Sequence, residues 1–434
     1  MATGIAITLV ASFVSGCAST ATLSTTTGTT GTPATTTTTP VTTTTTPATT
    51  TTTPATTTTT PATTTTTPAT TTTTPATTTT TPATTTTTTL ACSTAGVLAT
   101  WSLQSLAEQT VVVPVDESDV TSVTSEVAAG AGGVILFGAS APSNLGVALQ
   151  SLVASAPNGV APFVMTDEEG GAVQRMANLV GSIPSARQMG ATMTPAQIRQ
   201  LAAGLARRML AAGVTMDLAP VLDVDGGQGP DDRDPDGTRS FSAQEKIAAT
   251  DGLAFEAGLQ AGGIVPVVKH FPGLGGATGN TDVMPASTPP WSKLKRVGLV
   301  PFDDAIDAHV PAVMIANATI PGLTDLPASI SPVVISGLLR DQLGYQGLVI
   351  TDSLSAVALS AIGYSVPKAT VAAIQAGADM VLYGADPTAV ASLTNQTVAA
   401  VIAAVDAGKL ARSRLVSAVT HILNVKHVNL CSTG

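Results

Sequence analysis

Several polar side chains stand where apolar, strand-like runs end. Asp167, the adjacent Lys269 and His270, and Asp352 each close one such run. The run that delivers Lys269 and His270 continues into Pro272 and several glycines, which break a strand and open a loop. In a parallel barrel the carboxyl ends of the strands meet at one mouth, which is where barrel enzymes keep their reactive groups. The sequence therefore predicts a mouth that combines carboxylates with a lysine and a histidine.

The composition of this predicted mouth favours a sugar as its ligand. Further acids follow at Asp223 and Asp225, and Arg175 and Arg239 supply hydrogen-bond donors for hydroxyl groups. Glycoside hydrolysis uses carboxylates that flank an electrophilic carbon. Zinc chemistry has little support, because the mouth offers one histidine and no cysteine, and Ser353 lacks the elbow motif of serine hydrolases. We expect neither a metal nor a cofactor.

Four segments resemble the signature motifs of glycoside hydrolase family 3, most closely those of its single-domain bacterial β-N-acetylglucosaminidases. They are 167–175 (DEEGGAVQR), 239–241 (RSF), 269–273 (KHFPG) and 350–354 (ITDSL). The similarity extends from about residue 101 to residue 427. It implies a retaining double displacement on terminal β-linked N-acetylglucosamine or a related sugar, with Asp352 as the nucleophile. The residues that it implies for substrate binding are Asp167, Arg175, Arg239, Lys269 and His270.

Each of these residues also has a purely structural interpretation. Asp352 is a good N-cap for a helix that begins after it, and Asp167 is a possible cap or loop acid. Lys269 and His270 could be an ion-pair partner and a buried histidine. The two arginines could bridge to nearby acids.

The segment after the KHFPG motif departs from the family pattern. These relatives normally continue with His-Gly and then an Asp-x-His pair, whose histidine is the acid/base. Here 274–275 is Leu-Gly, and Asn280 and Asp282 replace the pair. Asp282 is therefore the first candidate proton donor, since paired carboxylates with separated pKa values are the usual arrangement. Asp225 or Glu168 is the second interpretation, and absence of an acid/base is the third.

Two function classes follow from these interpretations. The first is an exported exo-glycosidase that acts on cell-wall fragments or other glycans, with a β-glucosidase as a variant on the same fold. The second is a surface glycan-binding lipoprotein on the same barrel, without an efficient proton donor.

Eight apolar, β-rich runs alternate with helical patterns, which predicts a (β/α)8 TIM-type barrel in the α/β class. An open doubly wound sheet is the alternative, but the glycine-rich turn that it requires after its first strand is missing. The clearest helix covers Thr194–Ala212, with Thr194 as N-cap, and another covers Ser413–His427. The predicted strands are Val111–Val115, Val134–Gly138, Phe163–Asp167, Met216–Val224, Val265–Phe271, Ala312–Ala316, Leu348–Asp352 and Met380–Gly384.

The beginning of the chain predicts export. The apolar run Gly4–Gly16 fits a signal-peptide core, and the small residues before Cys17 resemble a bacterial lipobox. We expect a signal peptide over 1–17, with Cys17 lipidated as a membrane anchor; an ordinary secretory signal is the alternative. Residues 18–91 form a Thr/Pro-rich segment with a proline every seven residues from Pro33 to Pro82. This composition predicts a disordered, extended stalk, typical of O-glycosylated tracts.

The globular domain is predicted over 92–431, with Cys92 and Cys431 at its two edges. Because domain termini often lie close together, this pair either closes the domain as a disulfide or remains two free thiols. Nucleic acid is not an expected partner, since aromatics make up 3% of the chain and 28 acids outnumber 18 lysines and arginines. We expect a monomer whose partners are a carbohydrate and, through the anchor, a membrane.

Overall fold

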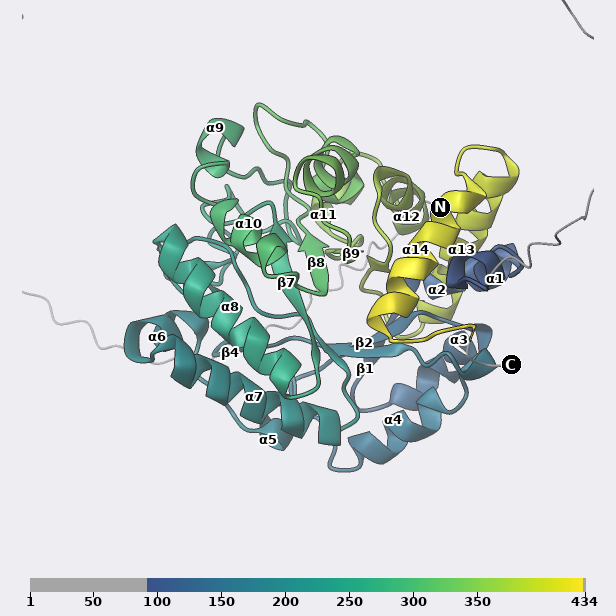
Figure 1. The fold of residues 1–434 in the computed structure, drawn as a ribbon, viewed down its shortest axis with the longest axis horizontal. Coiled ribbons are helices and arrows are strands. Elements are labelled where there is room, and N and C mark those ends of the chain that lie inside the picture. The colour runs from purple at the N-terminus through teal and green to yellow at the C-terminus, as the bar shows by residue number, and fades with distance from the viewer. Residues whose placement is uncertain (1–91, 432–434) are drawn as a thin grey trace, which may run out of the picture. The chain divides into compact units, whose positions relative to one another are not determined.

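The computed structural model describes residues 92–431, which form a parallel β-barrel surrounded by helices (Figure 1). The predicted signal peptide, Cys17 and the stalk lie outside the described residues. Within them, eight strands pair in the order β10-β1-β2-β3-β6-β7-β8-β9, all parallel. The strands are β1 (Val111–Asp116), β2 (Gly133–Phe137), β3 (Phe163–Thr166), β6 (Met216–Asp217), β7 (Val265–Phe271), β8 (Ala312–Ile315), β9 (Leu348–Thr351) and β10 (Val381–Leu382).

The sheet closes on itself next to β10. Ile350 in β9 bridges to Met380, the residue before β10, and the Thr351 N–H donates to the Met380 carbonyl at 3.1 Å. The (β/α)8 prediction is therefore confirmed, and the open doubly wound alternative is wrong. All eight predicted strands exist. The fourth is much shorter than predicted, because Pro220 has no N–H to donate to a ladder; beyond β6 the chain stays beside β7 with an isolated bridge from Val221 to Lys269.

Helices cover the outside of the barrel (Figure 1). The predicted helix after Thr194 is α7, and it begins with a capping box in which the side chains of Thr194 and Gln197 bond to each other's backbone N–H. The longer helices are α4 (Leu145–Val153), α7 (Pro195–Ala211), α8 (Glu245–Ala261), α10 (Val300–Asp307), α12 (Val366–Ala376), α13 (Val390–Asp406) and α14 (Arg412–Val425). Shorter ones are α1 (Thr94–Leu98), α2 (Leu103–Gln109), α3 (Thr124–Ala129), α5 (Ala177–Val180), α6 (Ala186–Thr192), α9 (Trp291–Leu294) and α11 (Val357–Ser360). A π-helix covers Val333–Gln342.

One end of the barrel is plugged by apolar side chains. Ile422 of α14 belongs to the cluster inside the barrel, and Val425 packs against it beside Phe163, the first residue of β3. Because Phe163 marks the end where the strands begin, α14 closes that end. The opposite end, where the strands finish, is left to the polar residues.

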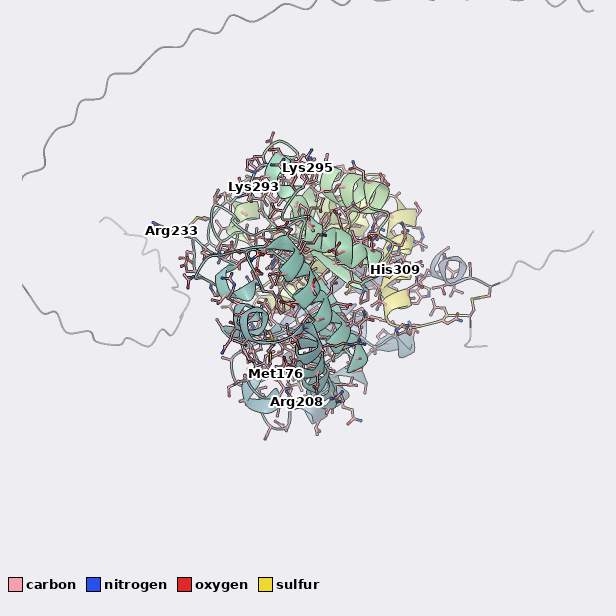
Figure 2. All side chains as sticks on the ribbon, turned by 60° about the vertical axis from the view of Figure 1, so that its left-hand side comes forward. Met176, Arg208, Arg233, Lys293, Lys295 and His309 are labelled. Atoms are coloured by element: carbon pink, nitrogen blue, oxygen red, sulfur yellow. A yellow bond between two sulfur atoms is a disulfide. The ribbon has the colours of Figure 1, made fainter. Side chains whose placement is uncertain are left out.

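An antiparallel hairpin follows β3. Its strands are β4 (Glu168–Gly170) and β5 (Val173–Gln174). The buried Glu168 carboxylate accepts hydrogen bonds from the Met176 N–H and from Gln174. Arg208 of α7 donates to the carbonyl of Val180 at the end of α5, so the segment after the hairpin is tied to the outer helices near Met176 (Figure 2).

Candidate active site

A pocket of about 390 Å³ opens at the carboxyl ends of the strands. Its floor is apolar, with Ile135, Leu218 and Met314 from inside the barrel, and its walls are polar. This mixture suits a sugar ring, which has apolar C–H faces and hydroxyl edges. The pocket is lined by all seven residues to which the sequence assigns catalysis or substrate binding: Asp167, Arg175, Arg239, Lys269, His270, Asp282 and Asp352.

Asp352 stands at the end of β9. Its backbone N–H donates to the Ile315 carbonyl at 2.9 Å, which continues the pairing with β8 and fixes the direction of the side chain. One carboxylate oxygen accepts the Ser353 N–H at 2.7 Å, and the other has no hydrogen-bond donor among the described residues. The next helix, α11, has Ala356 at its N-cap. Asp352 therefore is not a helix cap, and one of its oxygens is available to a ligand.

Asp282 reaches the same pocket from the loop after β7. The Asn280 side chain accepts the Asp282 N–H at 2.9 Å. The carbonyls of Thr281 and Asp282 accept the N–H groups of Ala358 and Val357 at 3.0 and 3.3 Å. These bonds dock the loop after β7 onto the segment after β9, so Asp282 and Asp352 share one cavity.

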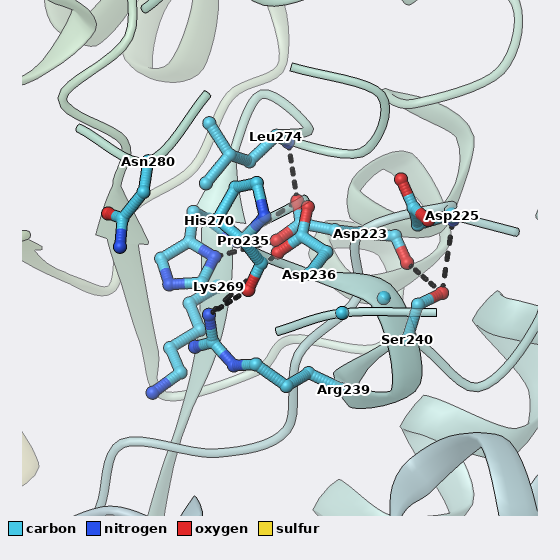
Figure 3. A network of polar contacts seen from close by, with 12 residues as sticks. Asp223, Asp225, Pro235, Asp236, Arg239, Ser240, Lys269, His270, Leu274 and Asn280 are labelled. Carbon is cyan, nitrogen blue, oxygen red and sulfur yellow. Dashed lines mark hydrogen bonds and ion pairs between the residues drawn. The ribbon is translucent and has the colours of Figure 1, made fainter. Parts of the chain in front are cut away.

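The two other acids considered as proton donors do not line this pocket. Glu168 is fully buried in β4 and accepts bonds from its own hairpin. Asp225 points away from His270 (Figure 3), and its carboxylate accepts the N–H groups of Gly227 and Gly276. The interpretation of either acid as the proton donor is therefore wrong, because their carboxylates are occupied by structural hydrogen bonds outside the cavity.

A network of opposite charges forms one wall. Lys269 Nζ lies 2.7 Å from Asp167 Oδ1 and 2.6 Å from Glu169 Oε1. Arg239 holds Glu169 in a bidentate pair, with both bonds at 2.8 Å. Burial alone would raise the pKa of Glu169, but the charges of Arg239 and Lys269 lower it far below its ordinary value. Glu169 is therefore ionised between two cations, and the four residues present fixed hydrogen-bonding groups to the pocket.

Arg175 is less firmly held than Arg239. Its Nη2 lies 3.8 Å from Asp167 Oδ2, and its guanidinium lies over the Phe137 ring at 5.8 Å. The Arg175 Nε is buried and has no hydrogen-bond partner among the described residues. A buried N–H without an acceptor is costly, and this one is closed to solvent, so a ligand can reach Arg175 only through the remainder of its side chain, which is 36% exposed.

His270 is oriented by Asp223. Its Nδ1 lies 2.6 Å from Asp223 Oδ2, which leaves Nε2 for a ligand (Figure 3). Burial, helped by the charge of Arg239, lowers the pKa of His270 to about 4, so the ring is neutral at physiological pH. Asp223, Asp236 and His270 are also the group of described residues whose potential metal-ligand atoms all lie within 4.8 Å of one another.

The end of the third predicted strand places Glu169 near the mouth together with Asp167, but the sequence does not show its pairing with Arg239, 70 residues away. Sequence patterns give no sign of Asp236, which lies behind the pocket wall beside Asp223 and His270. Asp236 lies in an acid-rich loop, 231–236, without any apolar run to place it. Only the fold brings Asp236 close to Asp223, so the sequence alone could not associate the two residues.

Comparison with known proteins agrees with the geometry. Residues 109–425 match the glycosyl hydrolase family 3 N terminal domain. The chain is 34% identical over 348 residues to the beta-hexosaminidase LpqI of Mycobacterium tuberculosis, covering 77% of this chain and 85% of that protein. It is 35% identical over 280 residues to an uncharacterized secreted glycosyl hydrolase of Arthroderma benhamiae, covering 62% and 78%. The crystal structure of a beta-N-acetylhexosaminidase from Beutenbergia cavernae superposes with a TM-score of 0.68 at 32% identity, covering 76% of this chain and 99% of that one.

The matched region contains the whole barrel and every residue that lines the pocket. The resemblance drawn from the four sequence motifs is therefore confirmed, and glycoside hydrolysis is the chemistry of the fold's polar mouth. The chain belongs to glycosyl hydrolase family 3.

Proposed function

We propose that this protein is an exported, retaining exo-β-N-acetylhexosaminidase that removes terminal β-linked N-acetylglucosamine or a related sugar from cell-wall or other glycans. The proposal is carried by one observation, the presence of Asp352 and Asp282 in a single pocket beside a wall of sugar-binding groups. The names of the relatives support the choice of sugar.

The reaction begins with Asp352. Its ionised carboxylate attacks C1 of the sugar, while the bond from C1 to the leaving oxygen breaks and Asp282 gives that oxygen its proton. The product of this step is a covalent glycosyl ester on Asp352. Asp282, now ionised, takes a proton from water as the water attacks C1, and the Asp352 carboxylate leaves. Bonds and protons balance over the two steps, and no cofactor is consumed.

The charged wall holds the sugar during both steps. Asp167 accepts hydrogen bonds from sugar hydroxyls, and its pair with Lys269 holds it in place. The Arg175 side chain lines the same cavity, and His270 Nε2 offers a further polar contact. Such preorganised groups are worth most in a cavity that excludes water.

Trapping of the intermediate tests this mechanism. A 2-fluoro glucoside, or a 5-fluoro N-acetylglucosaminide that keeps the acetamido group on C2, each with a good leaving group, should inactivate the enzyme, and mass spectrometry of peptides should locate one adduct on Asp352. Asp352→Asn should lower kcat by at least about a thousandfold, while circular dichroism shows an unchanged fold. Saturable binding of chitooligosaccharides without turnover by the wild-type protein would instead favour the glycan-binding alternative.

We also propose that residues 1–91 export the domain and anchor it, through lipidated Cys17 and the Thr/Pro-rich stalk, to the cell surface. The apolar run before Cys17 and the secreted relative support this proposal. Cell fractionation of a Cys17 variant provides its test.

A further inference from the structure

Asp236 is a buried acid without any hydrogen-bond donor. Its side chain is 1% exposed, and neither carboxylate oxygen has a hydrogen-bond partner among the described residues. The nearest cation, Arg239 Nη1, lies 4.0 Å from Oδ1 and is already engaged with Glu169 and the Pro235 carbonyl. A bare carboxylate in such a place is strongly unfavourable, because it has lost its water and gained no hydrogen bond. The group therefore needs either a proton or a bound cation.

The hydrogen bonds of Asp223 show which of the two acids holds the negative charge. Asp223 accepts the N–H groups of His270 and Leu274 at 3.1 and 2.6 Å, and its Oδ2 also faces His270 Nδ1 at 2.6 Å (Figure 3). The two backbone N–H donors on this carboxyl favour its ionised form, which only accepts hydrogen bonds, and His270 Nδ1 is placed to supply a third. Asp236, next to it, receives none. A single proton shared by this pair therefore belongs on Asp236.

We propose that Asp236 is a protonated carboxylic acid that donates a hydrogen bond to Asp223, keeps Asp223 ionised, and thereby fixes His270 as the tautomer with its proton on Nδ1. Asp236 is a positioning residue, since it acts on the pocket through Asp223 and His270. This assignment stands on burial and hydrogen-bond geometry. It rests on the proposed function only for its effect on activity.

The position of this proton decides what His270 can offer to a sugar. With Asp223 ionised, the Nδ1–H bonds to Asp223, and Nε2 faces the ligand as an acceptor for a hydroxyl. If the proton were on Asp223 instead, Asp223 would donate to Nδ1, and Nε2 would carry the hydrogen as a donor. The same contact would then have the opposite polarity.

The surrounding charges agree with a neutral Asp236. The titratable and charged groups that act on it are Asp223 and Asp225 after β6, His270 at the end of β7, and Arg239 in its own loop. Burial raises the pKa of Asp236 well above its ordinary value, and the neighbouring Asp223 raises it further, whereas His270 and Arg239 act in the other direction. Burial raises the pKa of Asp223 to about 7, against the hydrogen bonds from the backbone N–H groups of Leu274 and His270, which lower it.

A metal ion fits this cluster less well than a proton. Two ligand atoms on one zinc-sized ion, each at about 2 Å from it, stand roughly 3 Å or more apart. Asp223 Oδ2 and His270 Nδ1 are separated by only 2.6 Å, which is the length of a hydrogen bond. A cation would have to displace that bond. A metal site is therefore the alternative that the experiment must be able to detect.

The test compares Asp236→Asn with the matched control Asp234→Asn in thermal unfolding from about pH 4 to pH 8. Asn copies a neutral acid at position 236. Asp234 in the same loop accepts the N–H groups of Gly229 and Gly237 at 2.7 and 3.0 Å, one on each oxygen. The amide nitrogen of an Asn there would face an N–H donor. We therefore expect a lower Tm than wild type for Asp234→Asn at neutral pH.

For Asp236→Asn we expect the opposite change, a higher Tm than wild type at neutral pH. A carboxyl whose pKa is raised on folding loses stability as pH climbs above its ordinary value of 3.8, because the unfolded chain has already released the proton. Asn removes this loss. Asp236→Asn should match the wild type near pH 4 and exceed its Tm by a few degrees at pH 7 to 8. Infrared spectra of the wild type at pH 7 should contain a carboxylic acid C=O band that this variant lacks.

Two outcomes would overturn the proposal. In the first, the Tm of Asp236→Asn at neutral pH is lower than that of the wild type, by as much as the Tm of Asp234→Asn is. The other is stoichiometric metal in the purified protein together with a Tm that drops on addition of EDTA, which would make the cluster a metal site. For activity, Asp236→Asn should retain kcat/KM within about threefold, and Asp236→Ala should lose at least about tenfold. The unfolding and infrared data need no substrate, so they remain decisive if the proposed function fails.

Discussion

Asp352 and Asp282 have different surroundings, which suits the different protonation states that their proposed roles require. Burial raises the pKa of Asp352, as does Asp282, whereas the hydrogen bond from the Ser353 N–H and the charge of Lys269 lower it. Burial also raises the pKa of Asp282, while Arg239 lowers it and Asp167 raises it. The Ser353 N–H and Lys269 thus favour the anion of Asp352, whereas Arg239 alone favours that of Asp282 at the more exposed mouth of the pocket. When one of two coupled carboxyls ionises first, the other retains its proton to higher pH.

We therefore predict a bell-shaped pH dependence of kcat/KM. The acid limb reflects ionisation of the nucleophile, and the alkaline limb reflects loss of the proton from Asp282, so both limbs belong to the coupled pair. In Asp282→Asn the amide cannot supply a proton, and the alkaline limb should disappear. The rate with a poor leaving group should fall by about two to four decades. Kinetics with aryl N-acetylglucosaminides at several pH values measure both effects.

Substrates that differ in their leaving group provide an internal control for Asp282→Asn. An aryl glycoside whose phenol is strongly acidic needs no protonation, so Asp282→Asn should hydrolyse it at a rate close to that of the wild type. Asn280→Ala removes a pocket-lining amide that accepts the Asp282 backbone N–H, but it leaves the Asp282 carboxyl in place and should have a smaller effect. An unaltered alkaline limb in Asp282→Asn would transfer the role of proton donor to another group.

The individual site residues differ in how far sequence reasoning could predict them. Asp352 and Lys269 end apolar strands, and their position follows from the pattern and the topology alone. Asp282 follows from its alignment with a family motif, because its loop has no periodic pattern. The neutral state proposed for Asp236 depends on which groups surround it in three dimensions. Local sequence contains no information on that environment.

At the scale of elements, the long periodic segments were predictable and the irregular ones were not. The strands β1 and β7 lie within a residue of the prediction, since continuous apolar runs of β-branched residues fit a sheet covered on both faces. The hairpin of β4 and β5 could not be predicted in this way, because strands of two or three residues are too short to show an alternation of apolar and polar residues. Its register also shifts between Glu168 and Gly170.

Asp379 closes the barrel where β9 meets β10, and it provides a prediction at the scale of these elements. Its backbone N–H donates to the Val349 carbonyl at 2.8 Å, and its side chain accepts the Val349 N–H at 3.0 Å. Arg340 and Arg414 contact the same fully buried carboxylate at 2.7 and 2.6 Å. Burial alone would raise the pKa of Asp379, but the hydrogen bond from His421 and the two arginine charges lower it.

Asp379→Asn should lower the free energy of unfolding by about 3 to 5 kcal/mol, because two partly buried arginines lose their counter-charge. Asp304→Asn is the control, since Asp304 pairs with the exposed Lys246 at 3.5 Å and should contribute less than about 1 kcal/mol. The wild type should lose this stabilisation as pH falls below 3.8 through the lowered pKa of Asp379. Urea denaturation at several pH values measures the free energy of unfolding of the wild type and of both variants, and its decrease in the wild type at low pH. Equal effects of the two substitutions would show that Asp379 does not hold the barrel closed.

At the scale of the whole molecule, the two ends of the described domain are joined covalently. Cys92 and Cys431, 339 positions apart, form a disulfide beside α1 and α14. None of the residues around this disulfide lines the catalytic pocket. The cross-link therefore constrains the ends of the domain and leaves the mouth untouched. No helix among residues 92–431 combines the length and the apolar content that crossing a bilayer requires.

The disulfide bears on where the protein acts, because such bonds persist in oxidising compartments. The apolar run before Cys17 offers a route to that compartment, and the thiol of Cys17 offers an anchor. We predict that the wild-type protein fractionates with membranes and incorporates labelled palmitate, whereas Cys17→Ala appears in the medium. Both forms should contain the Cys92–Cys431 bond and hydrolyse the same aryl glycoside, since the pocket lies wholly within the domain. A Cys17→Ala variant that stays with membranes would disprove lipid anchoring, and recovery of both forms as reduced intracellular protein would disprove export.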